Sequence, residues 1–127
     1  MVPLVASTVK AGFPSPADDY LETPLDLNEK LIHNPAATFI VRVSGDSMQG
    51  AGIFPGDYLV VDKSLEAHAG SIVVAVVNNE FTLKRLQYDA SGQAMLVAAN
   101  PAYAPITFHE GDEMSIWGVV KHVIRDV

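Results

Sequence analysis

The feature that most constrains the fold is a set of three runs rich in β-branched residues. These runs are residues 38–43, 57–62 and 71–77, and each is bounded by turn-forming residues. β-Branched side chains favour the pleated, half-buried surface of a sheet. Asn78-Asn79 separates the third run from another extended segment, residues 80–87, and the pair is typical of a tight hairpin turn. The chain is therefore expected to be mostly β.

Two further segments, residues 93–99 and 114–124, also have an extended pattern. About five to seven strands at such short spacing are typical of one continuous antiparallel sheet. We therefore predict a strongly bent antiparallel sheet or open barrel.

One short helix is predicted before the first strand. Leu27, Leu31 and Ile32 would lie close together on a helix that begins after Asp26, a suitable N-cap. Asn34-Pro35 would end it, because proline disfavours helical backbone in the residue before it.

The opening of the chain differs from the rest. Residues 1–24 have little hydrophobic periodicity and contain four prolines, which exclude regular helix and indicate an extended arm. We expect an arm over residues 1–24 and one folded domain over residues 25–127. A chain of 127 residues with 49% hydrophobic residues is long and apolar enough for a single core.

Composition excludes several classes of function. Without cysteine there is neither a disulfide framework nor a thiolate zinc site, and a cytoplasmic location is the expectation. The histidines, at positions 33, 68, 109 and 122, have no ligand spacing, so we expect no metal and no cofactor. A net charge of −7 would repel a phosphate backbone, which disfavours direct nucleic-acid binding. No segment approaches the roughly 20 apolar residues of a membrane span.

Ser47 is a candidate nucleophile. It lies in Ser44-Gly45-Asp46-Ser47-Met48, where a strand is expected to run into a glycine that permits a tight bend. Ser47 would then lie on a turn, with its hydroxyl free and with backbone N–H groups near it that could stabilise an oxyanion. The alternative is an ordinary loop with Ser47 at its solvated tip.

Lys84 is a candidate general base for Ser47. Alternation along residues 80–87 places Lys84 on one face of the strand and Arg85 on the other. If Lys84 points inward, desolvation lowers the pKa of its amine and makes it a competent base, as in Ser-Lys variants of the catalytic triad. Alternatively, Phe81 and Leu83 form the core face and Lys84 is a surface residue.

The remaining candidates have simpler interpretations. Asp46, Asp57 and Asp62 are assigned structural roles, since aspartate commonly closes turns at strand ends. Met48 is interpreted as a packing residue or as part of a cleft wall.

Four linked segments resemble the LexA/UmuD family of self-cleaving Ser-Lys peptidases. In this sequence they are Ser44-Gly45-Asp46-Ser47-Met48, Gly56-Asp57-Tyr58-Leu59-Val60-Val61-Asp62, Gly70-Ser71-Ile72-Val73-Val74-Ala75 and Glu80-Phe81-Thr82-Leu83-Lys84-Arg85-Leu86. Their order matches that of the family, as does the interval from Ser47 to Lys84. Within the family, the UmuD branch is the most similar. Residues 11–20 resemble its cleavage region, and residues 100–106 and 117–120 continue the likeness.

The resemblance implies autoproteolysis between Ala11 and Gly12. Ser47 would be the nucleophile and Lys84 the general base and then the proton donor to the leaving amine. Backbone N–H groups of Ser47 and its neighbour Asp46 would form the oxyanion hole. The small side chains at the scissile bond suit an extended substrate that approaches the hydroxyl closely.

The resemblance also implies partners. Cleavage would be promoted by a RecA filament on single-stranded DNA, and the trimmed chain would join a UmuC-type translesion polymerase in the SOS response. A homodimer is expected, paired through exposed strand edges or through residues 114–124. The alternative is a dimeric binding module that never cleaves and only docks on a polymerase or a recombinase filament.

Two features depart from the family pattern. LexA-type repressors carry an N-terminal helix-turn-helix domain, whereas only residues 1–11 precede the proposed scissile bond here. We therefore expect regulation of a partner rather than of an operator. The arm is also shorter than is usual in the UmuD branch, which leaves cleavage within one chain and cleavage between two chains both open.

Overall fold

The computed structural model describes residues 2–5, 8–12 and 24–127. The chain divides into two units, Met1–His33 and Asn34–Val127, and each is described by itself. Much of the predicted extended arm lies outside the described residues, so the arm stays a prediction there.

The first unit contains the predicted helix, α1, which spans Leu27–Leu31. The carboxylate of Asp26 accepts a hydrogen bond from the backbone N–H of Asn28 at 3.0 Å, which confirms Asp26 as the N-cap. The helix ends before the predicted stop at Asn34-Pro35, because Ile32 already has extended backbone angles (φ −122°, ψ 101°).

The second unit is a seven-stranded antiparallel sheet, as the sequence predicted. Two short 3₁₀ helices, η1 (Pro35–Ala37) and η2 (Gln49–Ala51), precede β1 and β2. The strands are β1 (Thr38–Arg42), β2 (Tyr58–Asp62), β3 (Ile72–Val77), β4 (Glu80–Tyr88), β5 (Ala94–Val97), β6 (Ile106–Thr107) and β7 (Met114–Ile124). Asn78 and Asn79 form the predicted hairpin turn between β3 and β4, with φ values of 47° and 69°. Only β6 was not predicted, since two residues are too few for a periodic pattern.

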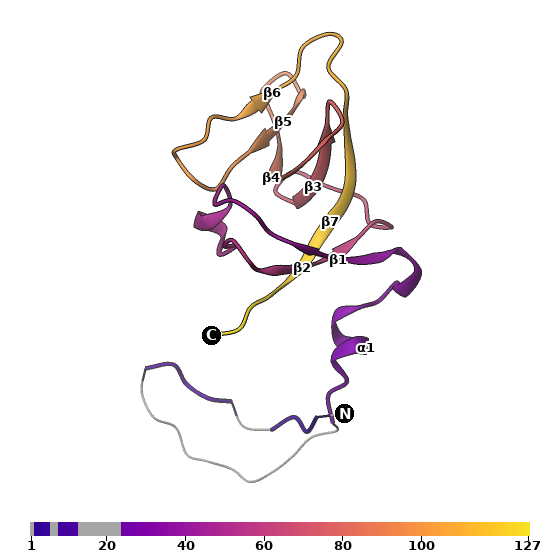
Figure 1. The fold of residues 1–127 in the computed structure, drawn as a ribbon, viewed down its shortest axis with the longest axis vertical. Coiled ribbons are helices and arrows are strands. Elements are labelled where there is room, and N and C mark those ends of the chain that lie inside the picture. Colours follow the sequence, from indigo (N-terminus) through magenta and orange to yellow (C-terminus); the bar gives the residue numbers. More distant parts are fainter. Residues whose placement is uncertain (1, 6–7, 13–23) are drawn as a thin grey trace. The chain divides into compact units, whose positions relative to one another are not determined.

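The long strand β7 joins the two ends of the sheet (Figure 1). The spatial order is β1-β2-β7-β3-β4-β5-β6, so the last strand in sequence lies inside the sheet, between β2 and β3. Residues 114–119 of β7 pair with β3, and residues 119–124 pair with β2. Each half of β7 has a different partner, so the sheet bends along this strand. It remains open, because the edge strands β1 and β6 do not pair with each other.

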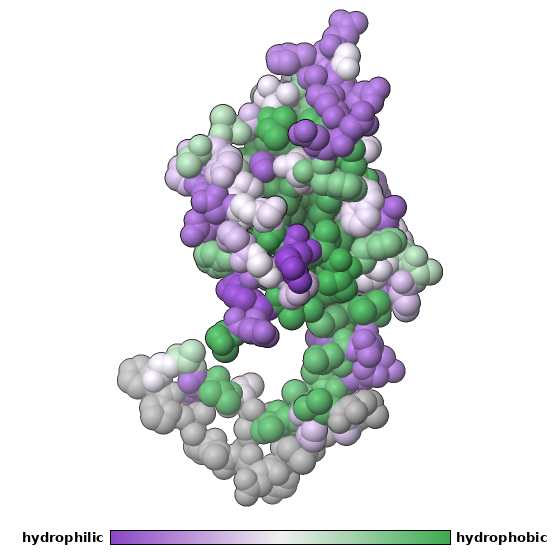
Figure 2. All heavy atoms as spheres, viewed as in Figure 1, coloured by the Kyte–Doolittle hydropathy of each residue, from purple (hydrophilic) through white to green (hydrophobic). Residues whose placement is uncertain are grey.

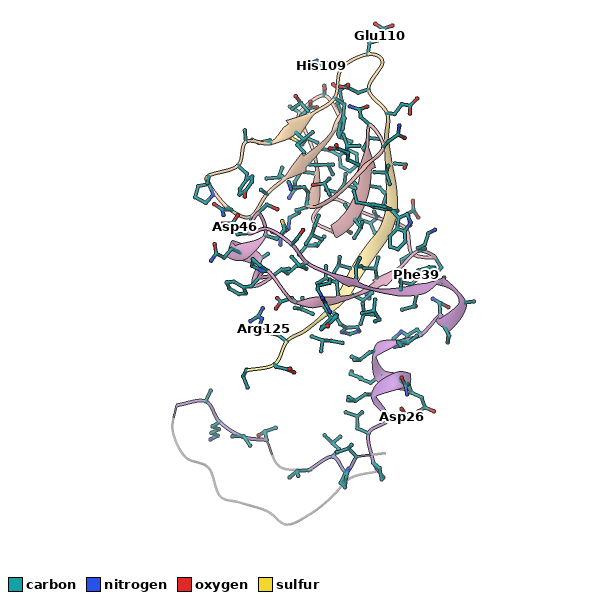
Figure 3. All side chains as sticks on the ribbon, in the orientation of Figure 1. Asp26, Phe39, Asp46, His109, Glu110 and Arg125 are labelled. Atoms are coloured by element: carbon teal, nitrogen blue, oxygen red, sulfur yellow. The ribbon has the colours of Figure 1, made fainter. Side chains whose placement is uncertain are left out.

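The core packs on both faces of the sheet. One cluster of buried residues comprises Val43, Met48, Ile53, Leu59, Val61 and Val74, and a second comprises Val73, Ala75, Leu86, Leu96 and Val119. The adjacent residues Val73 and Val74 belong to different clusters, because successive side chains of a strand point to opposite faces. Figure 2 shows hydrophobic residues gathered over the middle of the sheet and hydrophilic ones at the tip before β7, where Figure 3 labels His109 and Glu110. Among the described residues, no helix is long and apolar enough to cross a membrane.

Candidate active site

Ser47 lies in the turn that follows β1. Gly45 has a φ of +82°, a left-handed conformation that glycine adopts without strain and that lets the chain turn away from the strand. The residue after Ser47, Met48, is 1% exposed and packs in the first core cluster. This buried methionine anchors the turn, so the Ser47 side chain is held over the sheet rather than at a solvated tip.

Lys84 points inward from β4. It is 8% exposed and pairs in the ladder with Val73 of β3, which is fully buried. The buried residues of β4 are Lys84 and Leu86, on one face, whereas on the other face Phe81 is 67% exposed and Leu83 is half-buried. The structure therefore favours the first of the two alternatives that alternation left open.

The Lys84 amine and the Ser47 hydroxyl are in hydrogen-bonding contact. Lys84 Nζ donates to Ser47 Oγ at 3.1 Å, to Thr82 Oγ1 at 3.0 Å and to the carbonyl oxygen of Leu83 at 3.1 Å. Three acceptors match the three N–H donors of an ammonium group. Once the amine loses one proton, its lone pair can accept the proton of the Ser47 hydroxyl.

Burial changes the acid–base behaviour of Lys84. Desolvation holds the pKa of this amine below its ordinary value of 10.5, because a charged ammonium is less stable away from water. No carboxylate accepts a hydrogen bond from Lys84 Nζ among the described residues to offset that effect. The neutral form is therefore populated at a lower pH than in an exposed lysine.

Ser47 and Lys84 line the same cleft, whose volume is about 220 Å³. Its walls are polar and apolar in similar measure and come from β1, the following turn, β2, β3 and β4. The other lining residues are Val41, Arg42, Val43, Ser44, Gly45, Met48, Leu59, Val74, Phe81, Thr82 and Leu83. Met48 is thus both a packing residue and part of the cleft wall, as expected from the sequence.

Sequence reasoning missed three residues at this site. Thr82 contacts the Lys84 amine, and the signal was available because residues two apart on a strand share a face. Asn100 and Tyr103 both contact Asp46. They come from the loop between β5 and β6, and no local pattern indicated that this loop reaches the Ser47 turn.

The acidic residues considered from sequence have the structural contacts expected of them. Asp57 is 1% exposed, forms a salt bridge with Arg125 at 2.6 Å and accepts a hydrogen bond from the Phe54 N–H at 2.8 Å. Asp62 accepts from both the backbone N–H and the hydroxyl of Ser64. Within the described part of the chain, no group of three or more histidine, aspartate or glutamate residues could hold a metal ion.

Similarity to known proteins agrees with this geometry. A family described as Peptidase S24-like matches residues 3–121. The chain is 49% identical over 123 residues to protein SamA of Salmonella typhimurium (strain LT2), which covers 97% of this chain and 84% of SamA. It is 45% identical over 123 residues to protein MucA of Escherichia coli, covering 95% of this chain and 82% of MucA. It is 38% identical over 122 residues to the LexA repressor of Pseudomonas chlororaphis, covering 95% of this chain but 59% of the repressor.

These matches define first a class and then a family. The mostly β fold and the serine peptidase match place the chain in a class of serine peptidase domains. The chain belongs to the Peptidase S24-like family, the LexA/UmuD family that the sequence motifs indicated.

Proposed function

We propose that this chain is a self-cleaving serine peptidase that cuts its own arm between Ala11 and Gly12. The observation that carries the proposal is the contact of Lys84 Nζ with Ser47 Oγ at 3.1 Å in a cleft where Lys84 is only 8% exposed. A buried amine with a lowered pKa, next to a hydroxyl, is the arrangement that nucleophilic catalysis without histidine requires.

The reaction proceeds in two steps. Neutral Lys84 takes the proton of the Ser47 hydroxyl as Oγ attacks the carbonyl carbon of Ala11. Backbone N–H groups at Ser47 and Asp46 stabilise the oxyanion of the tetrahedral intermediate. The bond to the nitrogen of Gly12 then breaks, and Lys84 returns the proton to that amine. Water, activated by the again neutral Lys84, hydrolyses the acyl-enzyme ester and releases Ser47.

The proposed scissile bond has the chemical properties that such a reaction needs. Ala11 and Gly12 are both exposed, and no atom lies within 4 Å of the position that a Cβ would take at Gly12. A bond between two small residues allows the hydroxyl to approach the carbonyl carbon closely. We propose the boundary between arm and catalytic domain at residues 24 and 25.

The proposed biological role follows from the family. A RecA filament on single-stranded DNA promotes cleavage in the cytoplasm during the SOS response, and the trimmed chain becomes an accessory subunit of a UmuC-type error-prone polymerase. Identity of 44–49% to SamA, ImpA and MucA supports placing the chain on this branch of the family.

We also propose that the chain acts as a homodimer. Val120, Val123 and Ile124 of β7 pair with β2, and the ladders of the described residues give these three no second strand. A half-paired strand that ends in the exposed side chains of Val123 and Ile124 is suited to pair with a second copy.

The test is self-cleavage of the purified chain at about pH 10, where the lowered pKa of Lys84 gives it a larger neutral fraction than an exposed lysine has, without an activator. Intact mass is followed in the wild type and in Ser47→Ala. Loss of residues 1–11 in the wild type alone supports the proposal. If both proteins stay whole, the incubation is repeated with a recombinase filament, ATP and single-stranded DNA. A second negative would leave the non-cleaving binding module as the better interpretation.

A further inference from the structure

Two segments far apart in the sequence meet at the peptide group between Asp46 and Ser47. The side-chain amide of Asn100 donates to the carbonyl oxygen of Asp46 at 3.0 Å, and the backbone N–H of Gln49 donates to the same oxygen at 3.2 Å. The Tyr103 hydroxyl donates to the carboxylate of Asp46 at 2.6 Å. Figure 3 labels Asp46 at the place where the loop after β5 comes down to the Ser47 turn.

Asn100 is itself held in a fixed orientation. Its side-chain carbonyl accepts from the Ala102 N–H at 3.0 Å, and its backbone carbonyl accepts from the Tyr103 N–H at 3.1 Å. The preceding carbonyl, of Ala99, accepts from the Gly50 N–H at 2.7 Å. A Cβ at Gly50 would come within 2.5 Å of that oxygen, so glycine is what allows the two segments to approach. The amide of Asn100 therefore has one end fixed by its own loop and the other directed at Asp46.

This contact determines the direction of the Ser47 N–H. The described peptide bonds are trans, and the C=O and N–H of a trans peptide point in opposite directions. Since the carbonyl is held toward Asn100 and Gln49, the Ser47 N–H points away from them. It donates to none of the residues that the structure describes. A peptide group that accepts two hydrogen bonds is also polarised, which strengthens its N–H as a donor.

We propose that Asn100 is a positioning residue for the self-cleavage reaction. It holds the peptide between Asp46 and Ser47 so that the Ser47 N–H faces the oxyanion of the tetrahedral intermediate. The inference rests on the proposed function, and it assigns to the loop between β5 and β6 a part in building the oxyanion hole. Asn100 makes none of the hydrogen bonds to the Lys84 amine, so the proposed effect is on the geometry of the oxyanion donor.

The test compares Asn100→Ala with wild type and with a matched control, Gln93→Ala. Gln93 also donates from a side-chain amide to a backbone carbonyl, that of Phe108 at 3.3 Å, and contacts none of the site residues. First-order cleavage rates are measured across pH, together with thermal unfolding. We expect Asn100→Ala to be about 10–100-fold slower on the alkaline plateau, the cost of a misplaced oxyanion donor. The midpoint of the pH profile and the cooperative melt should be retained, and Gln93→Ala should cleave like the wild type.

The variant Asn100→Asp removes the hydrogen-bond donor while keeping the side-chain contact within the loop. It keeps the oxygen that accepts from the Ala102 N–H, loses the donor to Asp46 and adds a negative charge. Its rate is therefore compared on the alkaline plateau, where a raised pKa of Lys84 no longer limits the reaction. Asn100→Asp should show the same loss of cleavage rate, about 10–100-fold, on the alkaline plateau. If Asn100→Ala does not fold, the rate of Asn100→Asp tests the positioning role of Asn100.

Rates within about twofold of wild type in Asn100→Asp would overturn the proposal. The proposal would also be overturned if the slower cleavage of Asn100→Ala came entirely from a shifted midpoint of the pH profile. Such a shift would mean that the substitution changes the pKa of Lys84 rather than the oxyanion donor.

A second readout does not depend on cleavage. The amide resonance of Ser47 is followed by ¹H–¹⁵N NMR near neutral pH in the wild type, Asn100→Ala and Gln93→Ala. We expect the Ser47 resonance to shift in Asn100→Ala and to stay in place in Gln93→Ala. If the wild type never cleaves, the proposed function fails and this resonance alone decides whether Asn100 positions the peptide. An unshifted resonance overturns the inference in either case.

Discussion

Replacing Lys84 with methionine should change how the stability of the domain depends on pH. Methionine has a similar length, no charge and good tolerance of a core environment. The background is Ser47→Ala, so that no cleavage occurs during the measurement. In that background, Lys84 keeps its contacts with Thr82 Oγ1 and the Leu83 carbonyl.

The sign follows from proton binding in the two states. The folded-state pKa of Lys84 lies below its ordinary value of 10.5, because the residue is desolvated. Between those two pKa values, the unfolded chain holds a proton that the folded chain lacks. Raising the pH through this window therefore stabilises the folded state by up to about 1.36 kcal/mol per pH unit. Below the folded-state pKa, both states hold the proton and Lys84 contributes no slope.

The measurement is the free energy of unfolding in urea at several pH values for Ser47→Ala and for Ser47→Ala with Lys84→Met. Subtracting one series from the other removes the contribution of every other titrating group. The difference should be constant at low pH, with the methionine variant the more stable, and should then shrink as the pH rises toward 10.5. The cleavage rate of the wild type should rise over the same pH range, because only the neutral amine accepts a proton. A stability difference that does not change with pH would refute the argument that Lys84 is a desolvated base.

Three further predictions concern the arm, the core and the ion pair between exposed Arg125 and buried Asp57. Gly12→Val should block cleavage, followed by intact mass, while leaving the cooperative melt of the domain unchanged; loss of that melt would mean that the arm supports the fold. Leu96→Ala should lower the free energy of unfolding by about 2–5 kcal/mol, because Leu96 is fully buried, whereas Leu65→Ala, at a residue 38% exposed, should cost less than about 1 kcal/mol. The hydrogen-bonded Arg125 guanidinium holds the pKa of Asp57 below its usual 3.8, so the pair stabilises the fold above that pH and the stabilisation is lost as the pH falls through the lowered pKa. Arg125→Met should therefore be less stable at neutral pH and show a shallower loss in acid, and an acid limb as steep as in the wild type would contradict this assignment.

Much of the architecture could be predicted from local pattern. The period-two runs gave six of the seven strands, because alternation of side chains is a property of any half-buried strand. Asn78-Asn79 fixed the hairpin between β3 and β4, since asparagine tolerates the positive φ that this turn needs. The helix start was also readable, because an N-cap is a contact between residues two apart.

Local sequence pattern predicted only part of the active site. The sequence determined that Lys84 and Arg85 point to opposite faces of one strand, and that Ser47 follows a glycine able to turn the chain. It left open which face of β4 packs against the core, because alternation fixes the faces relative to each other and not relative to the rest of the fold. Tertiary packing decided this, when β4 paired with the buried strand β3 and brought Lys84 Nζ to 3.1 Å from Ser47 Oγ.

Only the tertiary structure decided the contacts between distant segments. The position of β7 between β2 and β3, and the reach of Asn100 to the carbonyl of Asp46, join residues that no local pattern links. Such contacts depend on strand order and loop path, which follow from the packing of the whole sheet. The sequence by itself therefore determined the elements and the chemical groups, and the tertiary fold determined which of those groups meet.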